Sequence, residues 1–279
     1  MKRGAALAAV FVVAVGSGGS ARQLPFTTQK STGQNVTPAY EGWYRNPDGT
    51  FTLSFGYLNR NSSETVEIPI GPQNFVSPGP QNQGQPSEFQ PDRNWGVFGV
   101  KVPASFGAKS EIVWTLSFRG ATYAIPGSLH PNWQIDALEG EAGSNNTPPV
   151  IQFSENGPEA RGPMGITAGP VTATAGTPVT LNAWVKDDGK GATSVAGGGR
   201  GAAPPITLAW FKHQGPGKVA FQPATGRGVN TGSQITTRAT FDGPGDYIVR
   251  LRANDSSVAG AGHAQCCWSN GFLKVTVTK

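Results

Sequence analysis

The chain has 279 residues, of which 14% are charged, and its formal net charge is +5. This length is enough for two domains of ordinary size. The 39 glycines and 23 prolines favour many turns and argue against long helices. The positive charges are scattered along the chain, which excludes the clustered basic footprint of a nucleic-acid-binding protein.

Residues 1–21 have the pattern of a secretory signal peptide. Lys2 and Arg3 precede an apolar run over residues 5–15, and the small residues 19–21 are typical of a cleavage site. The apolar run is too short to span a bilayer comfortably. We therefore expect cleavage, no stable membrane insertion afterwards, and a secreted, periplasmic or cell-surface protein.

Residues 22–39 are rich in Gln, Thr and Ser, and we expect a flexible N-terminal segment. From residue 40 onwards apolar and polar side chains alternate. Because successive strand side chains point to opposite faces, this period of two predicts half-buried strands. The sequence thus predicts an N-terminal β-sandwich domain over residues 40–138. The clearest alternating runs are Phe51, Leu53, Phe55 and Tyr57, then Val66, Ile68 and Ile70, then Ile112, Trp114, Leu116 and Phe118.

Two stretches in this part of the chain lack a strand pattern. Residues 72–91 are rich in Pro, Gln and Gly, and loops of this length are often functional or disordered. Residues 139–159 contain a Ser, Asn, Thr and Pro run that is typical of a linker between domains. We therefore expect a second domain over residues 160–279.

The second half again alternates with period two, between turns rich in Gly and Pro. Trp210 lies in the middle of one such run, where a sandwich core has its central aromatic residue. Tyr247 follows a Gly-Pro-Gly-Asp turn, at the position of a tyrosine corner, in which the hydroxyl ties the turn to the strand. The strand signals are Val179, Leu181, Ala183 and Val185, then Ile235, Thr237, Ala239 and Phe241, then Tyr247, Val249, Leu251 and Ala253, and finally Leu273, Val275 and Val277.

The ordered combination of residues 175–181, 187–189, 206–210 and 241–247, with an Asn-Asp pair at 254–255, resembles the PKD-like modules of surface proteins. PKD-like modules are immunoglobulin-like sandwiches, and the resemblance implies a non-catalytic extracellular module. The sequence of residues 55–61 and 68–71 is similar to a region of exported bacterial proteins, and this resemblance implies no activity. The sequence thus predicts an all-β protein of two β-sandwich domains in tandem, the C-terminal one immunoglobulin-like and of the PKD type.

The two cysteines, Cys266 and Cys267, are adjacent. Cysteines of exported proteins are usually oxidised, but neighbours close no ordinary loop. Three alternatives are open: a vicinal disulfide, free thiols, or pairing with another chain. A metal site that adds His263 would be a poor closed set of ligands.

Asp187, Asp188 and Asp255 follow strands whose ends can meet at one end of a sandwich. Calcium prefers several oxygen ligands that loops bring together, so these three carboxylates are candidate calcium ligands. The alternative is ordinary turn chemistry, in which Asp side chains accept hydrogen bonds from nearby backbone. We expect no other cofactor.

Trp43, Tyr44 and Trp133 lie beside turn residues and are candidate ligand-binding residues. Aromatic rings offer an apolar face to sugar rings, although in sandwiches most Trp and Tyr side chains belong to the core. For Trp114 and Trp210, which lie in mid-strand, we expect the core.

Three functional hypotheses of different classes follow. The leading one is a secreted or cell-surface, non-catalytic binding or adhesion protein that recognises an extracellular glycan or protein. The alternatives are a secreted hydrolase whose site lies in the N-terminal domain, near residues 72–91, and a structural spacer of an envelope complex. None of His130, His213 and His263 lies in a recognisable catalytic motif, so we expect no enzyme.

Overall fold

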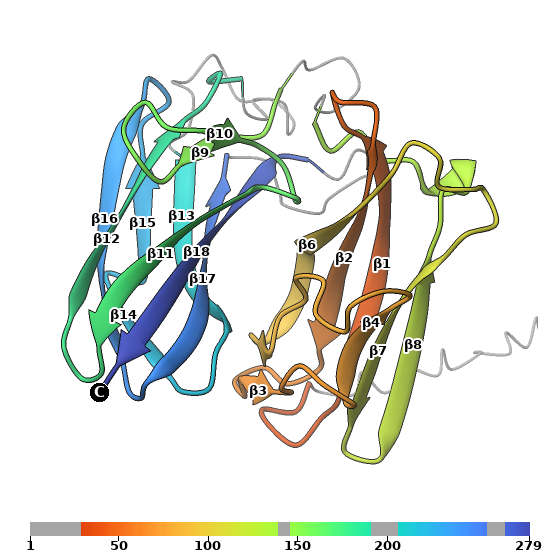
Figure 1. Ribbon diagram of the computed structural model, residues 1–279, viewed down its shortest axis with the longest axis horizontal. Helices are drawn as coiled ribbons and strands as arrows, with labels where there is room; N and C mark the ends of the chain where they lie inside the picture. The colour runs from red at the N-terminus through yellow and green to blue at the C-terminus, as the bar shows by residue number, and fades with distance from the viewer. Residues whose placement is uncertain (1–28, 139–145, 191–205, 256–265) are drawn as a thin grey trace, which may run out of the picture.

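The computed structural model describes residues 29–138, 146–190, 206–255 and 266–279 (Figure 1). Over these residues the protein consists of strands and one short 3₁₀ turn, η1 (Pro131–Trp133), which confirms the all-β prediction. In these ranges no helix is long and apolar enough to cross a membrane. The predicted signal peptide, residues 1–21, lies outside the described residues.

The N-terminal half forms a sandwich of two small sheets, with an extra ribbon at one end. Both three-stranded sheets are antiparallel and enclose one core between them. The ribbon pairs Val66 with Phe89. The first sheet has the order β1 (Val36–Arg45), β2 (Phe51–Asn59) and β6 (Asp92–Val102), the second has β4 (Asn74–Ser77), β7 (Ile112–Phe118) and β8 (Ala121–Gly127), and the ribbon is β3 (Val66–Glu67) with β5 (Glu88–Phe89).

Large aromatic side chains fill the core of this N-terminal sandwich. Phe55 stacks on Phe98 with ring centroids 5.3 Å apart, and the Trp114 ring meets Phe98 edge-on at 5.0 Å. Trp114 is 0% exposed, which confirms its expected place in the core. Its indole N–H donates to Asn74 Oδ1 at 3.0 Å, so the buried polar atom has a partner.

The C-terminal half forms a larger sandwich of two five-stranded sheets (Figure 1). The pairing of β11 with β18 is parallel and the other pairings are antiparallel. The first strands of the C-terminal half, within residues 150–174, belong partly to one sheet and partly to the other, as in immunoglobulin-like sandwiches. One sheet has the order β10 (Glu159–Ala160), β9 (Val150–Gln152), β12 (Val179–Lys186), β16 (Ser233–Phe241) and β14 (Val219–Gln222), and the other has β11 (Ile166–Thr174), β18 (Trp268–Thr278), β17 (Gly245–Asn254), β13 (Ile206–Gln214) and β15 (Thr225–Gly228).

The two aromatic positions predicted for the C-terminal sandwich are as expected. Trp210 is buried in the core and stacks on Phe221 with ring centroids 6.4 Å apart. The Tyr247 hydroxyl donates to Gly243 O at 2.8 Å, which is the contact of a tyrosine corner. The immunoglobulin-like prediction therefore holds, and the PKD type stays a prediction.

Two predicted boundaries need correction. Strands β9 and β10 lie inside residues 139–159, which the sequence analysis assigned to a linker, and β9 pairs with β12 so that Ile151 is fully buried. A strand of three residues is too short to show period two, so the pattern missed it. Likewise β1 begins at Val36, inside the expected flexible segment 22–39.

Candidate functional site

The long loop 72–91 lies against the C-terminal sandwich. Ser87 N donates to His213 O at 2.8 Å, and Gln214 Nε2 donates to Gln85 O at 2.6 Å. His213 Nε2 also lies 2.7 Å from Gly84 O. This loop, expected to be functional or disordered, thus forms a joint between the two sandwiches.

A buried lysine extends this joint. Lys212, whose side chain is 1% exposed, reaches from β13 to Glu67 and to Glu88, with Nζ 3.2 Å from Glu88 Oε2. Burial acts to lower the pKa of Lys212, but the hydrogen bond and charge of the two carboxylates outweigh it and raise the pKa. A hydrolase with its site near residues 72–91 would use carboxylates there, whereas Glu88, within this loop, and Glu67, just before it, both pair with this lysine.

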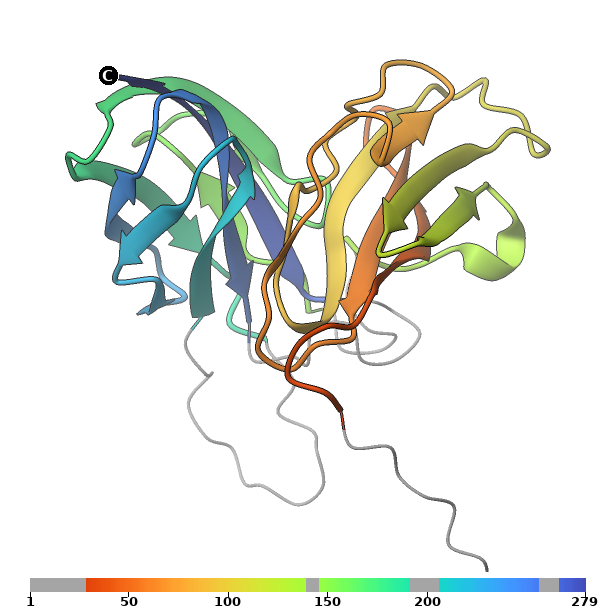
Figure 2. The ribbon, with the colours of Figure 1, turned by 90° about the horizontal axis from the view of Figure 1, so that it is seen from below.

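Strand β6 makes the second contact between the sandwiches (Figure 2). Gly96 has a φ of +45°, and a Cβ there would lie 2.3 Å from the Trp268 ring. Its carbonyl accepts from Trp268 Nε1 at 3.3 Å and from Asn270 Nδ2 at 2.7 Å. A glycine is therefore required where β6 lies against Trp268 of the C-terminal sandwich.

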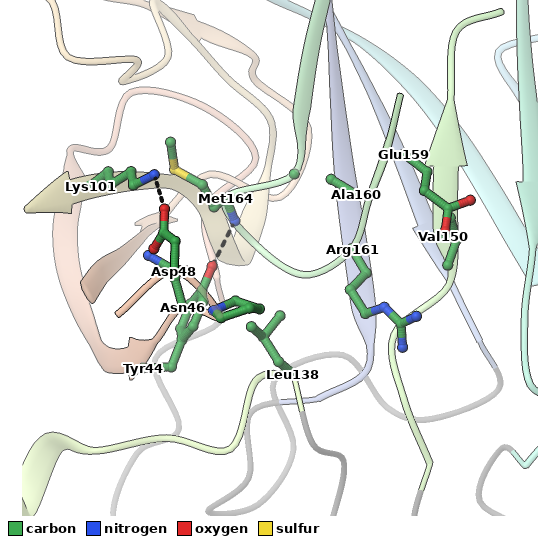
Figure 3. Close-up of a pocket in the computed structure, with 12 residues that line it drawn as sticks. Tyr44, Asn46, Asp48, Lys101, Leu138, Val150, Glu159, Ala160, Arg161 and Met164 are labelled. Carbon is green, nitrogen blue, oxygen red and sulfur yellow. Dashed lines mark hydrogen bonds and ion pairs between the residues drawn. The ribbon is translucent and has the colours of Figure 1, made fainter. Parts of the chain in front are cut away.

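A cleft of about 750 Å³ opens between the sandwiches, beside these contacts (Figure 3). Its size is that of a typical ligand site, and such sites often lie between domains. One wall comes from the end of β1, the turn after it and β6. The other comes from the β9 to β11 segment. The side chains that line it include Tyr44, Asn46, Pro47, Asp48, Lys101, Leu138, Val150, Glu159, Arg161 and Met164.

Most polar groups of the cleft are already engaged. The Tyr44 hydroxyl accepts from Met164 N at 3.1 Å and so ties the two walls together, and burial raises the pKa of this phenol to about 12. Asp48 pairs with Lys101 at 2.7 Å, and this hydrogen bond holds the pKa of the carboxyl well below its usual range. A floor of Leu138, Val150 and Met164 lies among these pairs.

Arg161 differs from the other charged residues of the cleft. Its side chain is exposed and extends between the two walls (Figure 3). Glu159, two residues before it, pairs with Lys186 at 2.7 Å instead. Among the described residues no carboxylate forms an ion pair with Arg161. The cleft therefore offers one guanidinium to a ligand.

The three candidate ligand-binding aromatics do not form one platform. Tyr44 is only 4% exposed, so its prediction as a stacking surface is wrong. The reason is the strand period, which turns Trp43 and Tyr44 to opposite faces of β1. Trp43 is half-buried and donates Nε1 to His130 O at 2.9 Å. Trp133 is 50% exposed and packs on Tyr40 at 5.7 Å between ring centroids, so its role and that of Trp43 stay predictions.

The structure places the three predicted calcium ligands at one end of the C-terminal sandwich, because Asp187 and Asp188 follow β12, Asp255 follows β17, and the adjacent residues Asn146 and Thr147 bond to Asp255 and Asp188. Thr147 donates to Asp188 through N and Oγ1, and Asn146 Nδ2 donates to Asp255 Oδ2 at 2.6 Å. Within the described ranges no group of three or more His, Cys, Asp or Glu side chains is arranged to hold a metal ion. Gly189 N donates to Asp187 Oδ2 and Lys190 N donates to Asp188 Oδ1, both at 2.9 Å, so these two carboxylates accept from nearby backbone as the turn-chemistry alternative expects. Calcium binding stays a prediction.

Cys266 and Cys267 are bonded to each other in the structure, and both are 0% exposed. They directly precede β18 and the buried Trp268. Pairing with another chain would require an exposed thiol, so this burial argues against that alternative. The oxidation state in solution stays a prediction.

The comparisons with known proteins add no family. No protein-family model matches the sequence, and no curated protein matches it. Among solved structures the chain is similar to the D00-D0 domain of intimin, with 10% identity, 88% of this chain and 100% of that chain covered, and a TM-score of 0.28. It is also similar to domains 4 and 5 of the S-layer protein SbsC, with 10% identity, 64% and 69% covered, and a TM-score of 0.26. At TM-scores this low, these likenesses carry no argument about this chain.

The residues that matter most for the cleft were missed by the sequence analysis. Arg161 lies at the predicted domain boundary, and Met164 lies in a short segment without period two. Neither position has a local signal, because the cleft exists only where two segments distant in sequence face each other. A charged residue at a domain boundary is too common a feature to predict a site.

Proposed function

We propose that this chain is an exported, non-catalytic binding protein that holds an extended segment of a partner protein in the cleft between its sandwiches. The observation that carries the proposal is the cleft itself, about 750 Å³ in volume with an apolar floor and a charged rim. Export rests on the N-terminal sequence pattern.

The chemistry of the cleft favours a peptide over a sugar. Leu138 and Met164 offer apolar surface to one or two side chains of the partner. Arg161 can bind a carboxylate through two parallel hydrogen bonds. The one aromatic residue of the lining, Tyr44, is buried, so a sugar ring would have no stacking surface there. The preferred segment is therefore extended, apolar and acidic.

A second candidate function rests on a different observation. Trp133 is half exposed, and the Tyr40 ring packs against its indole at 5.7 Å. An exposed indole held in place by a second ring is a suitable stacking surface for a sugar. In this alternative the protein binds a glycan at η1, away from the cleft.

The test screens the purified chain against a peptide-display library and a glycan array, and then measures the affinities of selected ligands. We expect selected peptides to combine an acidic with an apolar residue. Met164→Lys and Arg161→Glu should each weaken their binding at least tenfold, or about 1.4 kcal/mol. The matched control is Arg238→Glu, an exposed arginine on β16, which should leave the affinity within twofold.

The other outcomes select the other hypotheses. Equal binding of the peptides to wild type and to Met164→Lys contradicts the cleft. Glycan binding that Trp133→Ala abolishes selects the glycan alternative. Absence of any ligand in both screens favours a spacer, and release of a cleaved product from any compound favours a hydrolase.

A further inference from the structure

A second concave surface lies on the C-terminal sandwich, away from the cleft. It has a volume of about 320 Å³ and lies over β13, β15 and β17. Its walls are Arg227 and Arg252, and its floor includes the small side chains of Thr207 and Ala209. We call this surface the arginine recess.

Strand register explains why two arginines meet here. Ala209 pairs with Arg252 of β17 on one side and with Thr225 of β15 on the other. The neighbouring pair joins Thr207 to Arg227. Paired residues and those two positions along share one face of a sheet, so both guanidiniums flank the same two short side chains of β13. Small residues between long ones produce the depression.

A third arginine lies behind the recess. Arg250, two residues before Arg252, is 2% exposed; its Nη1 donates to Val97 O at 3.4 Å, while its Nε has no hydrogen-bond partner. The guanidiniums of Arg250 and Arg252 lie over the Phe211 ring, at 4.8 and 5.4 Å from its centre. Burial lowers the pKa of Arg250 to about 10 and also lowers that of Arg252, which reflects charge taken out of water.

Among the described residues, no carboxylate forms an ion pair with Arg227, Arg250 or Arg252. Tyr57, whose charge would help both buried arginines, has a pKa of about 12 because it is buried, and is therefore neutral at physiological pH. A buried cation without a counter-charge is costly, and such charges are usually paired. An anion in the recess would supply a counter-charge to Arg227 and Arg252, the two arginines that line it.

We propose that the arginine recess binds an oxyanion group, a sulfate or phosphate, carried by an acidic polysaccharide. Two guanidiniums from adjacent strands match the planar, bidentate hydrogen bonding that such groups accept. The volume of about 320 Å³ accommodates the charged group with part of one sugar ring. The recess includes residues of β15, the edge strand of its sheet, so no further strand of that sheet lies beyond it on this side, where a polymer could continue.

The test measures binding of the full chain to sodium sulfate, sodium phosphate, dextran sulfate and neutral dextran by calorimetry at low ionic strength. Arg227→Gln should weaken binding of dextran sulfate at least fivefold, and Arg252→Gln at least tenfold. The control, Arg238→Gln on the other sheet, should stay within twofold of wild type. Neutral dextran should not bind.

Further outcomes are equally informative. Arg227 is exposed on the edge strand β15, so Arg227→Gln carries the test even where Arg252→Gln does not fold. Binding of inorganic sulfate or phosphate without dextran sulfate supports the recess as an anion site and overturns the polysaccharide as its source. An equal loss in Arg238→Gln, or no loss in Arg227→Gln, overturns the proposal, because binding would then reflect only the net positive charge.

Discussion

The two sandwiches fill their cores with different side chains. In the N-terminal sandwich five rings contact one another in series, from Tyr57 through Phe89, Trp114 and Phe98 to Phe55, with centroid distances of 4.9 to 6.2 Å. The C-terminal core consists mainly of aliphatic side chains and includes the fully buried alanines Ala183, Ala239 and Ala253. One half thus depends on a few large rings and the other on many small contacts.

The difference in core composition follows from the number of strands in the sheets. The N-terminal sheets have three strands each, and large rings that bury roughly 150–250 Å² apiece compensate for the small number of core positions. The five-stranded sheets of the C-terminal half offer more core positions, and alanines allow the sheets to approach closely. We expect the N-terminal half to be more sensitive to the loss of a single side chain.

The largest expected effect tests this comparison directly. Trp114→Ala should lower the free energy of unfolding by about 4–5 kcal/mol, because it leaves a large cavity and removes the donor to Asn74 Oδ1. Trp210→Ala should cost about 3 kcal/mol, since Trp210 keeps 6% exposure. Urea denaturation of both variants measures the difference. If Trp210→Ala unfolds like the parent, the residue is not in the core and the predicted alignment of the C-terminal sandwich is wrong.

The joint between the sandwiches should contribute nearly as much to the free energy of unfolding as these core tryptophans. Lys212→Met should cost about 3 kcal/mol, because it leaves the mostly buried Glu88 without its cation. We expect one unfolding transition for the parent protein and two for Lys212→Met, one for each sandwich. Lys186→Met, which removes an exposed ion pair with Glu159, is the control and should change stability by less than about 0.5 kcal/mol. A calorimetric scan that keeps one transition in Lys212→Met would show that this lysine does not couple the halves.

A carboxyl in the C-terminal sandwich should reduce stability at neutral pH. Burial, with the charges of Asp255 and Asp188, raises the pKa of Asp187 from 3.8 to about 6. The folded protein therefore binds this proton more tightly than the unfolded chain, so the stability contribution present below pH 4 is lost as the pH rises through 6. Asp187→Asn should stabilise the protein at pH 7 by about 1 kcal/mol after allowance for partial exposure. The gain should disappear below pH 4 in a series of melting curves, and a constant gain at every pH would contradict this origin.

The tyrosine corner of the C-terminal sandwich adds one hydrogen bond, from the Tyr247 hydroxyl to Gly243 O. Tyr247→Phe removes the donor to Gly243 O and should cost about 1 kcal/mol. Tyr123→Phe, on β8 of the other sandwich, is the matched control and should change stability by less than about 0.5 kcal/mol. Equal effects of the two substitutions in urea denaturation would show that the corner contributes nothing specific.

The smallest expected effect concerns Cys266 and Cys267. A bond between neighbours closes almost no chain, so it restricts the unfolded state very little. Reduction should shift the melting temperature by less than about 2 °C, although intact mass should confirm that the bond has opened. A drop of many degrees would give the pair a structural role, and a disulfide-linked dimer on a non-reducing gel would mean pairing between chains.

The all-β class, the alternating core positions and the tyrosine corner were predictable from the amino-acid sequence. These features follow from local patterns, since a period of two along one strand decides which side chains can be buried. Trp114, Trp210 and Tyr247 were therefore found without the structure. Short strands such as β9 were not, because three residues cannot display a period.

The contact between the two sandwiches, and the cleft beside it, could be found only in the folded protein. Lys212 and Glu88 are 124 positions apart in the sequence, and no local pattern links them. The same holds for Tyr44 and Met164 in the cleft and for the arginines of the recess, which strand pairing alone brings together. Sites built across strands depend on register and packing, and these are properties of the whole fold that no segment specifies alone.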